Sequence, residues 1–279
     1  QSPLTNPFIT PKIVWTRVIA VANQKGGVGK TTTVINLSAC LAERGHNVLV
    51  IDMDPQANAT SGLGIEKKSG ISLYPVLTGN AKIIDQIQRT QLKGVDIIPS
   101  EIDLAGAEVD IARTDSYLHC LKNAMQDLLA AVKYDFIFID CPPSLGIITM
   151  NALTAANSVL ITMQCEYYAM EGLSVMVSLV KKLRESGANP SLEVEGILMT
   201  MFDARTRLAA DVVEEVRKHF PEIVYKTIIP RNVRISEAPS FGIPVILHDT
   251  GSAGAEAYRL FAKEFAKKSE AKRLTKQNS

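Results

Sequence analysis

The chain has 279 residues, of which 46% are hydrophobic and 21% are charged, and this composition excludes an intrinsically disordered protein. Its formal net charge of +1 excludes a global attraction to nucleic acid, so any binding to a polyanion must come from local patches. The four cysteines are scattered without a Cys-x-x-Cys pair, which argues against a zinc site or a disulfide framework and favours a reduced, cytoplasmic protein.

A chain of this length can bury one large core, and we expect a single domain between two tails. Residues 1–16 are predicted to be a flexible leader, because they contain prolines and lack the apolar segment of a signal peptide. The domain is predicted over residues 17–268. Residues 269–279 are predicted to be a basic, flexible tail.

Short apolar runs rich in β-branched residues alternate with amphipathic helical patterns. Continuous apolar strands are typical of a parallel sheet that is covered on both faces. The pattern therefore predicts a doubly wound, mostly parallel α/β sheet. Strands are expected at 18–22, 48–51, 95–98, 136–139, 159–162, 194–199 and 243–247, and helices at about 118–132 and 253–268. The uncharged run 145–163 contains polar residues such as Asn151 and Asn157, so we interpret it as a buried helix and strand rather than a membrane span.

The segment NQKGGVGKTTT, residues 23–33, lies between the first expected strand and a helix expected to begin near Thr31. In the pattern Gly-x-x-x-x-Gly-Lys-[Ser/Thr], backbone N–H groups surround phosphate oxygens, the lysine neutralises them and the hydroxyl binds Mg²⁺. Gln24 takes the place of the first glycine and Lys25 follows it, which gives the deviant Walker A form Lys-Gly-Gly-x-Gly-Lys-[Thr/Ser]. The strand before the loop and the helix after it argue against a chance glycine turn, and predict a P-loop NTPase of the deviant Walker A (SIMIBI-like) type.

Three aspartates end two of the expected strands: Asp52 and Asp54 in VLVIDMDPQANAT, and Asp140 in FIFIDCPPS. Carboxylates at the carboxyl ends of parallel strands face the ligand crevice of such folds. We interpret Asp140 as the Walker B carboxylate, which holds Mg²⁺ through water. Asp54 is a candidate to orient the attacking water and a second candidate to contact Mg²⁺ through water. The alternative is that these acids only end strands or cap helices, and it is strongest for Asp52.

Taken in order, these motifs resemble the ParA/Soj family of partitioning ATPases, within the deviant Walker A group that includes MinD and the nitrogenase iron protein. The likeness runs from about residue 17 to residue 266. Three later segments resemble Soj more than its cousins: SEIDLAGAEV at 100–109, MFDARTRL at 201–208 and IPRNVRISEAPSFGIPV at 229–245.

The resemblance implies an ATPase that uses ATP and Mg²⁺, and it assigns roles to matching residues. In the family's ATP-bound sandwich homodimer the signature lysine, here Lys25, reaches the phosphates of the partner subunit, much as an arginine finger does. Lys30 would contact the phosphates of its own subunit, Thr31 would bind Mg²⁺, and Pro230 and Asn232 would contact adenine. The residues expected to hold the phosphates are Gly26, Gly27, Val28, Gly29, Lys30, Thr31 and Thr32.

The resemblance also implies non-specific binding of double-stranded DNA by the dimer, through basic residues that match Arg205 and Arg234. Lys226 and Arg231 lie nearby in the sequence, and no acid stands between residues 222 and 237, so a positive strip is expected. A solvated basic loop is the alternative. Slow ATP hydrolysis, stimulated by a ParB-like DNA-bound partner, would release the DNA. This predicts a cytoplasmic, nucleoid-associated protein for chromosome or plasmid segregation.

Three other functions occur among proteins with this nucleotide-binding motif or this ATP cycle. A MinD-like membrane switch needs a C-terminal amphipathic helix, but residues 267–279 contain one bulky apolar residue, Leu274, so no stable membrane association is expected. An iron–sulfur protein needs matched cysteines, and Cys141 beside Asp140 has no suitably placed companion. A positioner of protein cargo on the nucleoid would use the same ATP cycle, and the sequence leaves this alternative open.

Overall fold

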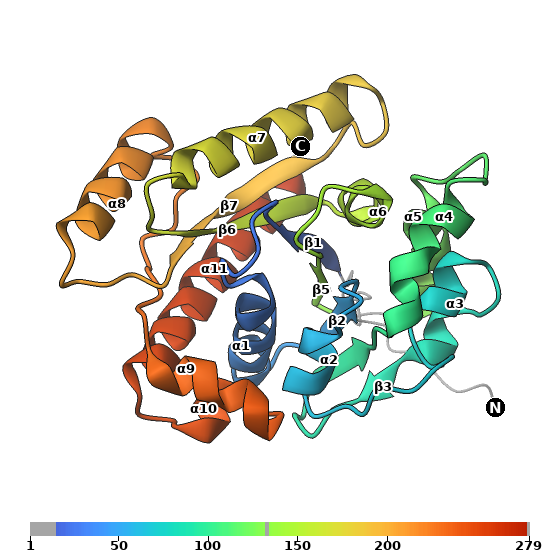
Figure 1. The fold of residues 1–279 in the computed structure, drawn as a ribbon, viewed down its shortest axis with the longest axis horizontal. Coiled ribbons are helices and arrows are strands. Elements are labelled where there is room, and N and C mark those ends of the chain that lie inside the picture. Colours follow the sequence, from blue (N-terminus) through green and yellow to red (C-terminus); the bar gives the residue numbers. More distant parts are fainter. Residues whose placement is uncertain (1–14, 132–133, 278–279) are drawn as a thin grey trace, which may run out of the picture.

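The computed structural model describes residues 15–131 and 134–277. A seven-stranded sheet with the order β3-β4-β2-β5-β1-β6-β7 forms its centre (Figure 1). All neighbouring strands are parallel except β3, which runs antiparallel to β4, so the predicted mostly parallel sheet is confirmed. The strands are β1 (Arg17–Ala22), β2 (Val48–Asp52), β3 (Gln88–Arg89), β4 (Val95–Ile98), β5 (Phe136–Asp140), β6 (Ser158–Gln164) and β7 (Glu193–Thr200).

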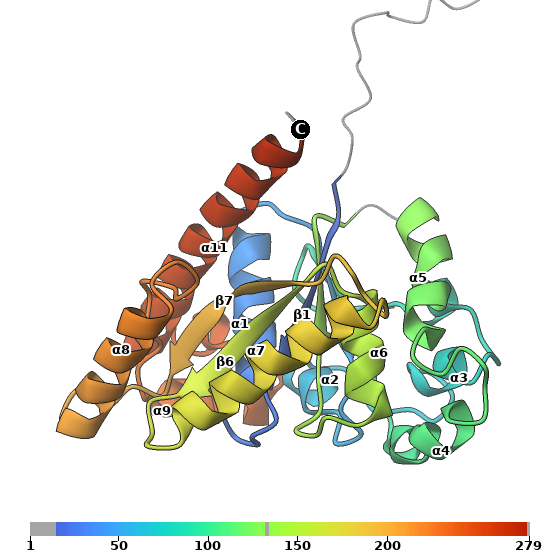
Figure 2. The same cartoon turned by 90° about the horizontal axis from the view of Figure 1, so that it is seen from above.

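Helices cover both faces of the sheet, as its continuous apolar strands require (Figures 1 and 2). One buried cluster lies under α1 (Lys30–Glu43), α2 (Asn58–Gly62), α9 (Val233–Glu237), α10 (Val245–His248) and α11 (Ala253–Gln277). The other lies under α3 (Tyr74–Leu77), α4 (Ala107–Ile111), α5 (Cys120–Ala131), α6 (Ile147–Ala155), α7 (Ala169–Glu185) and α8 (Arg207–His219). Three 3₁₀ turns complete the connections: η1 (Ile83–Gln86), η2 (Ile102–Gly106) and η3 (Ala238–Phe241).

Six of the seven expected strands are present, but the expectation of a strand at 243–247 is wrong. This segment forms the short helix α10, which begins after Pro244. The backbone N–H of Val245 donates to Oδ1 of Asn36 on α1 at 2.8 Å, so the segment is tied to a helix and not to a sheet edge. A short continuous apolar run fits a buried helix as well as a buried strand.

The run 145–163 forms a helix and a strand, α6 and β6, as expected. The aromatic stripe Tyr258, Phe261 and Phe265 of α11 is fully buried against the sheet. The helix is longer than expected, because it continues beyond residue 268 to Gln277. Residues 269–277 of the predicted tail are therefore helical, whereas the expected leader lies almost entirely outside the described residues.

A buried ionic network fixes the part of α11 beyond residue 268 to the amino end of the sheet. Nη1 of Arg17 donates to Oε1 of Glu195 at 3.1 Å and to Oγ of Ser269 at 2.6 Å. Nη2 donates to Oγ of Ser158 at 3.2 Å and also to Glu195. Lys272 donates to the same carboxylate at 3.2 Å. The Arg17–Glu195 pair is thus well compensated, which a buried ion pair requires.

Among the described residues, no helix combines the length and the apolar character needed to cross a membrane.

Candidate functional site

The loop between β1 and α1 has the backbone of an anion-binding turn. Gly27 and Gly29 have φ of 72° and 85°, in the left-handed region that favours glycine. Gly29 precedes the first residue of α1, and no side chain caps this helix. The N–H groups of its first turn are therefore available to a ligand, and the helix dipole favours a negative one.

Polar side chains from neighbouring strands hold this loop in place. Asn23 donates from Nδ2 to the carbonyl of Thr162 at 2.7 Å, and its Oδ1 accepts from the N–H of Lys25 at 3.1 Å. Thr200, at the end of β7, donates to the carbonyl of Val28 at 2.9 Å. Sequence reasoning did not single out Asn23 or Thr200 as support for the loop. Thr200 lies far from the motif in the sequence, so only the strand order could have pointed to it.

Lys30 is buried within the loop, with 6% of its surface exposed. Its Nζ donates to the carbonyl of Lys25 at 2.8 Å, so the ammonium bridges the turn. Burial lowers the pKa of Lys30, while the nearby carboxylates Asp140 and Asp54 act in the opposite direction. A buried ammonium with a single backbone acceptor is suited to binding an anion in the same space.

Thr31 and Asp140, which the sequence predicted to share a metal, meet in the structure. Oγ1 of Thr31 donates to Oδ2 of Asp140 at 2.8 Å, while Oδ1 of Asp140 is buried with no hydrogen-bond partner among the described residues. Burial, together with the charge of Asp52 in the paired position on β2, raises the pKa of Asp140 well above its usual range. A hydroxyl and an unsatisfied carboxylate oxygen are ligands of the kind that Mg²⁺ prefers, so these residues fit that ion.

Asp52 and Asp54 differ in their surroundings. Asp52 is fully buried and accepts hydrogen bonds from the N–H and the hydroxyl of Thr60, at 2.8 and 2.7 Å. Burial raises the pKa of Asp52 to about 6. It thus fixes the chain after β2, in line with the structural alternative considered for it. Asp54 lies nearer the surface and accepts from the N–H of Gln56 at 3.0 Å, which leaves its predicted role in orienting water a hypothesis.

Lys25, the second lysine of the motif, forms an ion pair within its own chain. Its Nζ lies 2.6 Å from Oε2 of Glu166, in the loop after β6, and both side chains are about half exposed. Sequence reasoning missed Glu166, since 141 positions separate the two residues.

The residues of the expected basic strip are not free of acidic neighbours. The backbone N–H of Arg231 donates to the carbonyl of Phe202 at 2.9 Å, which places the segment around residue 231 beside the loop that carries Arg205. The guanidinium of Arg205 donates two hydrogen bonds to Asp203, at 2.9 and 2.7 Å. No acid lies between residues 222 and 237 in the sequence, but in the structure Asp203 pairs with Arg205.

Arg234 is likewise paired with acidic side chains. It lies 2.9 Å from Glu237 and 3.2 Å from Asp249, and the second acid comes from another helix end. For Lys226 and Arg231 the described residues provide no ion pair, although the backbone of Lys226 donates to Glu264 at 2.8 Å. Two of the four basic residues are thus partly neutralised within the chain.

Pro230 and Asn232, expected at the adenine, precede α9. Oδ1 of Asn232 accepts from the N–H of Ile235 at 3.3 Å and caps that helix. Its carbonyl oxygen therefore has a structural task, and contact with adenine stays a prediction.

Comparison with known proteins identifies the family to which this architecture belongs. Residues 16–194 match the profile of a family described as an AAA domain. The sporulation initiation inhibitor protein Soj of Bacillus subtilis is 55% identical over 253 residues, which cover 90% of this chain and 98% of that protein. The chromosome partitioning protein ParA of Caulobacter vibrioides is 47% identical over 249 residues, covering 89% and 93%. The chain belongs to the ParA/Soj family of chromosome-partitioning ATPases. The resemblance and the enzyme class expected from the sequence are thereby confirmed.

A solved structure supports the fold assigned to this ParA/Soj chain. Cobyrinic acid a,c-diamide synthase from Mycobacterium smegmatis, crystallised with bound ADP and magnesium, is 38% identical with a TM-score of 0.76. The similarity covers 89% of this chain and 93% of that one. The P-loop ATPase fold predicted from the deviant Walker A motif is confirmed.

Proposed function

We propose that this ParA/Soj chain is an ATP-driven switch for the segregation of DNA. ATP and Mg²⁺ bind at the loop between β1 and α1, and two copies then form a sandwich dimer that binds double-stranded DNA without sequence preference. Slow hydrolysis, stimulated by a ParB-like DNA-bound partner, releases the dimer. The observation that carries this proposal is the different position of the two lysines of one loop. Lys30 is buried inside the turn, whereas the side chain of Lys25 is exposed outside it.

The residues around Lys30 account for binding and hydrolysis. The N–H groups from Gly26 to Thr32 hold the phosphates, and Lys30 neutralises them. Mg²⁺, when bound by Thr31 and through water by Asp140, supplies additional positive charge for the phosphate oxygens. Asp54 orients the attacking water, since phosphoryl transfer depends more on positioning and charge than on a strong base. Asp54→Ala should therefore bind ATP and dimerise but hydrolyse slowly.

Lys25 is proposed to act on the partner subunit. Its ammonium pairs with Glu166 at the surface, so it is not part of its own phosphate cradle. An exposed pair of this kind contributes little stability, and a triphosphate carries more charge than one carboxylate. Transfer of Lys25 from Glu166 to the phosphates of a second copy would couple dimerisation to bound triphosphate.

The DNA surface is proposed to comprise Arg205, Arg234, Arg231 and Lys226. Contacts from such residues to phosphates carry no sequence information, as non-specific binding requires. Arg205 and Arg234 first have to exchange Asp203, Glu237 and Asp249 for DNA phosphates, so binding by one copy alone should be weak. A dimer presents two such surfaces and gains from both.

A role in which the same cycle positions a protein cargo differs only in the partner that supplies the cargo. A MinD-like membrane role has less support, because the last described turns of α11 carry Lys267, Lys268, Lys272 and Arg273 around one exposed apolar side chain, Leu274. Sedimentation with anionic vesicles in ATP tests that role directly.

The deciding experiment measures binding to an arbitrary DNA duplex in ATP, in ADP and without nucleotide, each over a salt series. We expect binding in ATP only, with a steep fall as salt increases. Lys30→Ala should abolish the response to nucleotide. Arg234→Glu should lose DNA binding but keep basal hydrolysis, whereas Lys181→Glu, a matched charge reversal on α7, should keep both. Normal DNA binding by Arg234→Glu would refute the proposed surface, and no binding in any state would refute the nucleoid role.

A further inference from the structure

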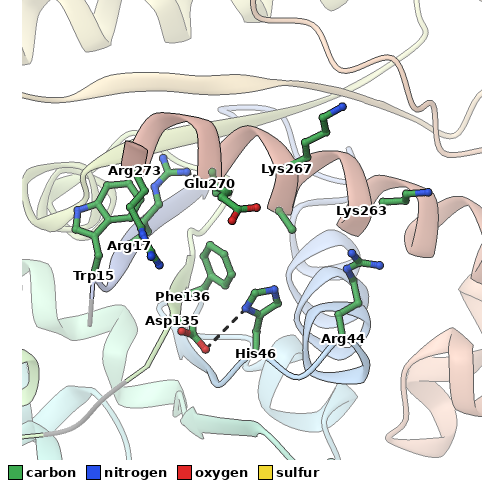
Figure 3. A pocket seen from close by; sticks show the side chains of 12 residues that line it. Trp15, Arg17, Arg44, His46, Asp135, Phe136, Lys263, Lys267, Glu270 and Arg273 are labelled. Carbon is green, nitrogen blue, oxygen red and sulfur yellow. Dashed lines mark hydrogen bonds and ion pairs between the residues drawn. The ribbon is translucent and has the colours of Figure 1, made fainter. Parts of the chain in front are cut away.

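A cavity lies at the amino end of the sheet, away from the phosphate loop. It has a volume of about 390 Å³, within the range of small-molecule sites. Its walls come from the start of β1, the start of β5, the end of α1 and the outer turns of α11 (Figure 3). The phosphate loop follows the opposite end of β1, a six-residue strand that spans about 20 Å. A small ligand in this cavity could not reach the phosphate loop.

The lining carries an excess of positive charge. It includes five Lys or Arg side chains and two carboxylates. Arg17 already pairs with Glu195, which does not line the cavity. Within the described part of the chain the other four cations form no ion pair. These cations are Arg44, Lys263, Lys267 and Arg273.

Arg273 gives a more specific sign of a missing partner. Its Nε is buried without a hydrogen-bond acceptor among the described residues, and a buried donor in this state carries a desolvation cost. Figure 3 shows Arg273 beside Trp15 at one end of the cavity and Arg44 at the other, with Phe136 and His46 between them. An anion near either end would meet a guanidinium group, and such groups bind phosphate with directional hydrogen bonds.

The same walls carry aromatic side chains. Phe136 is buried at the base of the cavity, and the ring of His46 lies 5.2 Å from it, edge to face. The guanidinium carbon of Arg17 lies 5.4 Å from the centre of the Trp15 ring. Aromatic rings beside a positive surface are typical of sites that stack a nucleobase and hold its phosphate. Glu270, for which the described residues provide no hydrogen bond, is an available acceptor for the amino group of a base.

We propose that this cavity is a second ligand site, which binds a small nucleoside phosphate independently of the ATP site. The base packs against the partly exposed rings of Trp15 and His46, and the phosphates lie among the cations of the lining, Arg44, Lys267 and Arg273. Residues 1–14 contain no Asp or Glu, so the segment next to Trp15 in the sequence offers no negative charge to these cations.

The chain contains its own reporter, because Trp15 is its single tryptophan. GDP is added to the full-length protein while tryptophan fluorescence is recorded, with N-acetyltryptophanamide as the correction for absorbed light. We expect saturable quenching, and about tenfold weaker responses to guanosine and to pyrophosphate, which each supply only part of the interaction. The response should persist in Lys30→Ala, in which the phosphate loop is disabled.

Paired variants show where the ligand binds. Arg44→Glu with Arg273→Glu should weaken GDP binding at least about tenfold, while Lys122→Glu with Lys181→Glu, the same change in charge on α5 and α7, should leave it unaltered. Equilibrium dialysis of labelled GDP with the double variant Trp15→Phe/Lys30→Ala measures binding without tryptophan fluorescence.

Four results would each overturn the proposal. These are the absence of saturable quenching up to about 1 mM GDP, loss of the response in Lys30→Ala, equal quenching by pyrophosphate alone, and quenching by duplex DNA but not by GDP. The last result would make the cavity part of a nucleic-acid surface instead.

Discussion

The two ends of the parallel sheet manage buried charge in opposite ways. At the amino end, Arg17 and Glu195 are buried together, and serine hydroxyls complete their hydrogen bonds. At the carboxyl end, Asp140 keeps one oxygen without a partner among the described residues, and the Lys30 ammonium is held by a single backbone carbonyl. The Arg17–Glu195 pair is therefore compensated within the chain, whereas Asp140 and Lys30 are compensated only by a ligand. The Arg17–Glu195 pair supports the fold. The groups around Lys30 and Asp140 contribute less to stability, because their arrangement serves ligand binding.

The largest expected effect comes from breaking the compensated end. Arg17→Leu leaves Glu195 buried without its main partner, and we expect it to lower the free energy of unfolding by about 3–5 kcal/mol. The ATPase rate per folded molecule should not change, because β1 begins at the end of the sheet away from the loop. Urea unfolding and phosphate release measure the two quantities.

The double variant Arg17→Leu/Glu195→Leu is the control, and it should recover much of the loss because it removes both buried charges. A loss below about 1 kcal/mol in the single variant would mean that Lys272 and Ser158 suffice for Glu195.

The converse variant disables the uncompensated end. Lys30→Ala removes the buried ammonium from the phosphate loop and should lower the ATPase rate at least about 100-fold. The free energy of unfolding without nucleotide should change by less than about 1 kcal/mol, since Lys30 donates only one hydrogen bond there. Lys181→Ala, at an exposed ion pair on α7, should change neither quantity. A large loss of stability in Lys30→Ala would show that this lysine supports the fold as well.

Acid should weaken the Arg17–Glu195 pair in a definite pH range. Burial alone would raise the pKa of Glu195, but the hydrogen bonds and the charge of Arg17 outweigh it, so the pKa is lowered from 4.5. A carboxyl group whose pKa is lowered by folding stabilises the folded state when the pH is above the pKa of the unfolded state. This stability is lost as the pH falls through the pKa of the folded state.

The free energy of unfolding should accordingly decrease below pH 4.5, with Glu195 contributing at most about 1.4 kcal/mol per pH unit. In Glu195→Gln this contribution disappears, so the acid limb of a urea-unfolding series should be shallower. An unchanged acid limb would assign the loss of stability to other carboxyl groups.

The contrast also explains how far the sequence alone could go. The six parallel strands and the phosphate loop were predictable, because continuous apolar runs and a glycine motif are local signals. The motif also led to Thr31 and Asp140, whose contact follows from the fold. The segment 243–247 was not predictable, since Asn36, the partner of Val245, lies 209 positions away. The length of α11 likewise depends on contacts of Ser269 and Lys272 with the start of the sheet.

Charge partners were the least accessible from sequence. The strip around Arg234 contains no neighbouring acid in the sequence before Glu237, yet Asp249 reaches it from the end of α10. Such pairs depend on how loops cross at a surface, and no local pattern encodes that.

The smallest expected effect concerns Lys25, which has a partner within its own chain and is also proposed to contact a ligand. Its pair with Glu166 is about half exposed, so the loss of this pair should change the free energy of unfolding by less than about 1 kcal/mol. Glu166→Gln removes the competing carboxylate and keeps the shape of the side chain. If Lys25 acts on a second copy, the variant should dimerise a few-fold more tightly in ATP, as measured by sedimentation, and not at all in ADP. Glu185→Gln, which releases Lys181 on α7 in the same way, should leave dimerisation unaltered. Weaker dimerisation of Glu166→Gln in ATP would indicate that Glu166 positions Lys25 for the partner instead of competing for it.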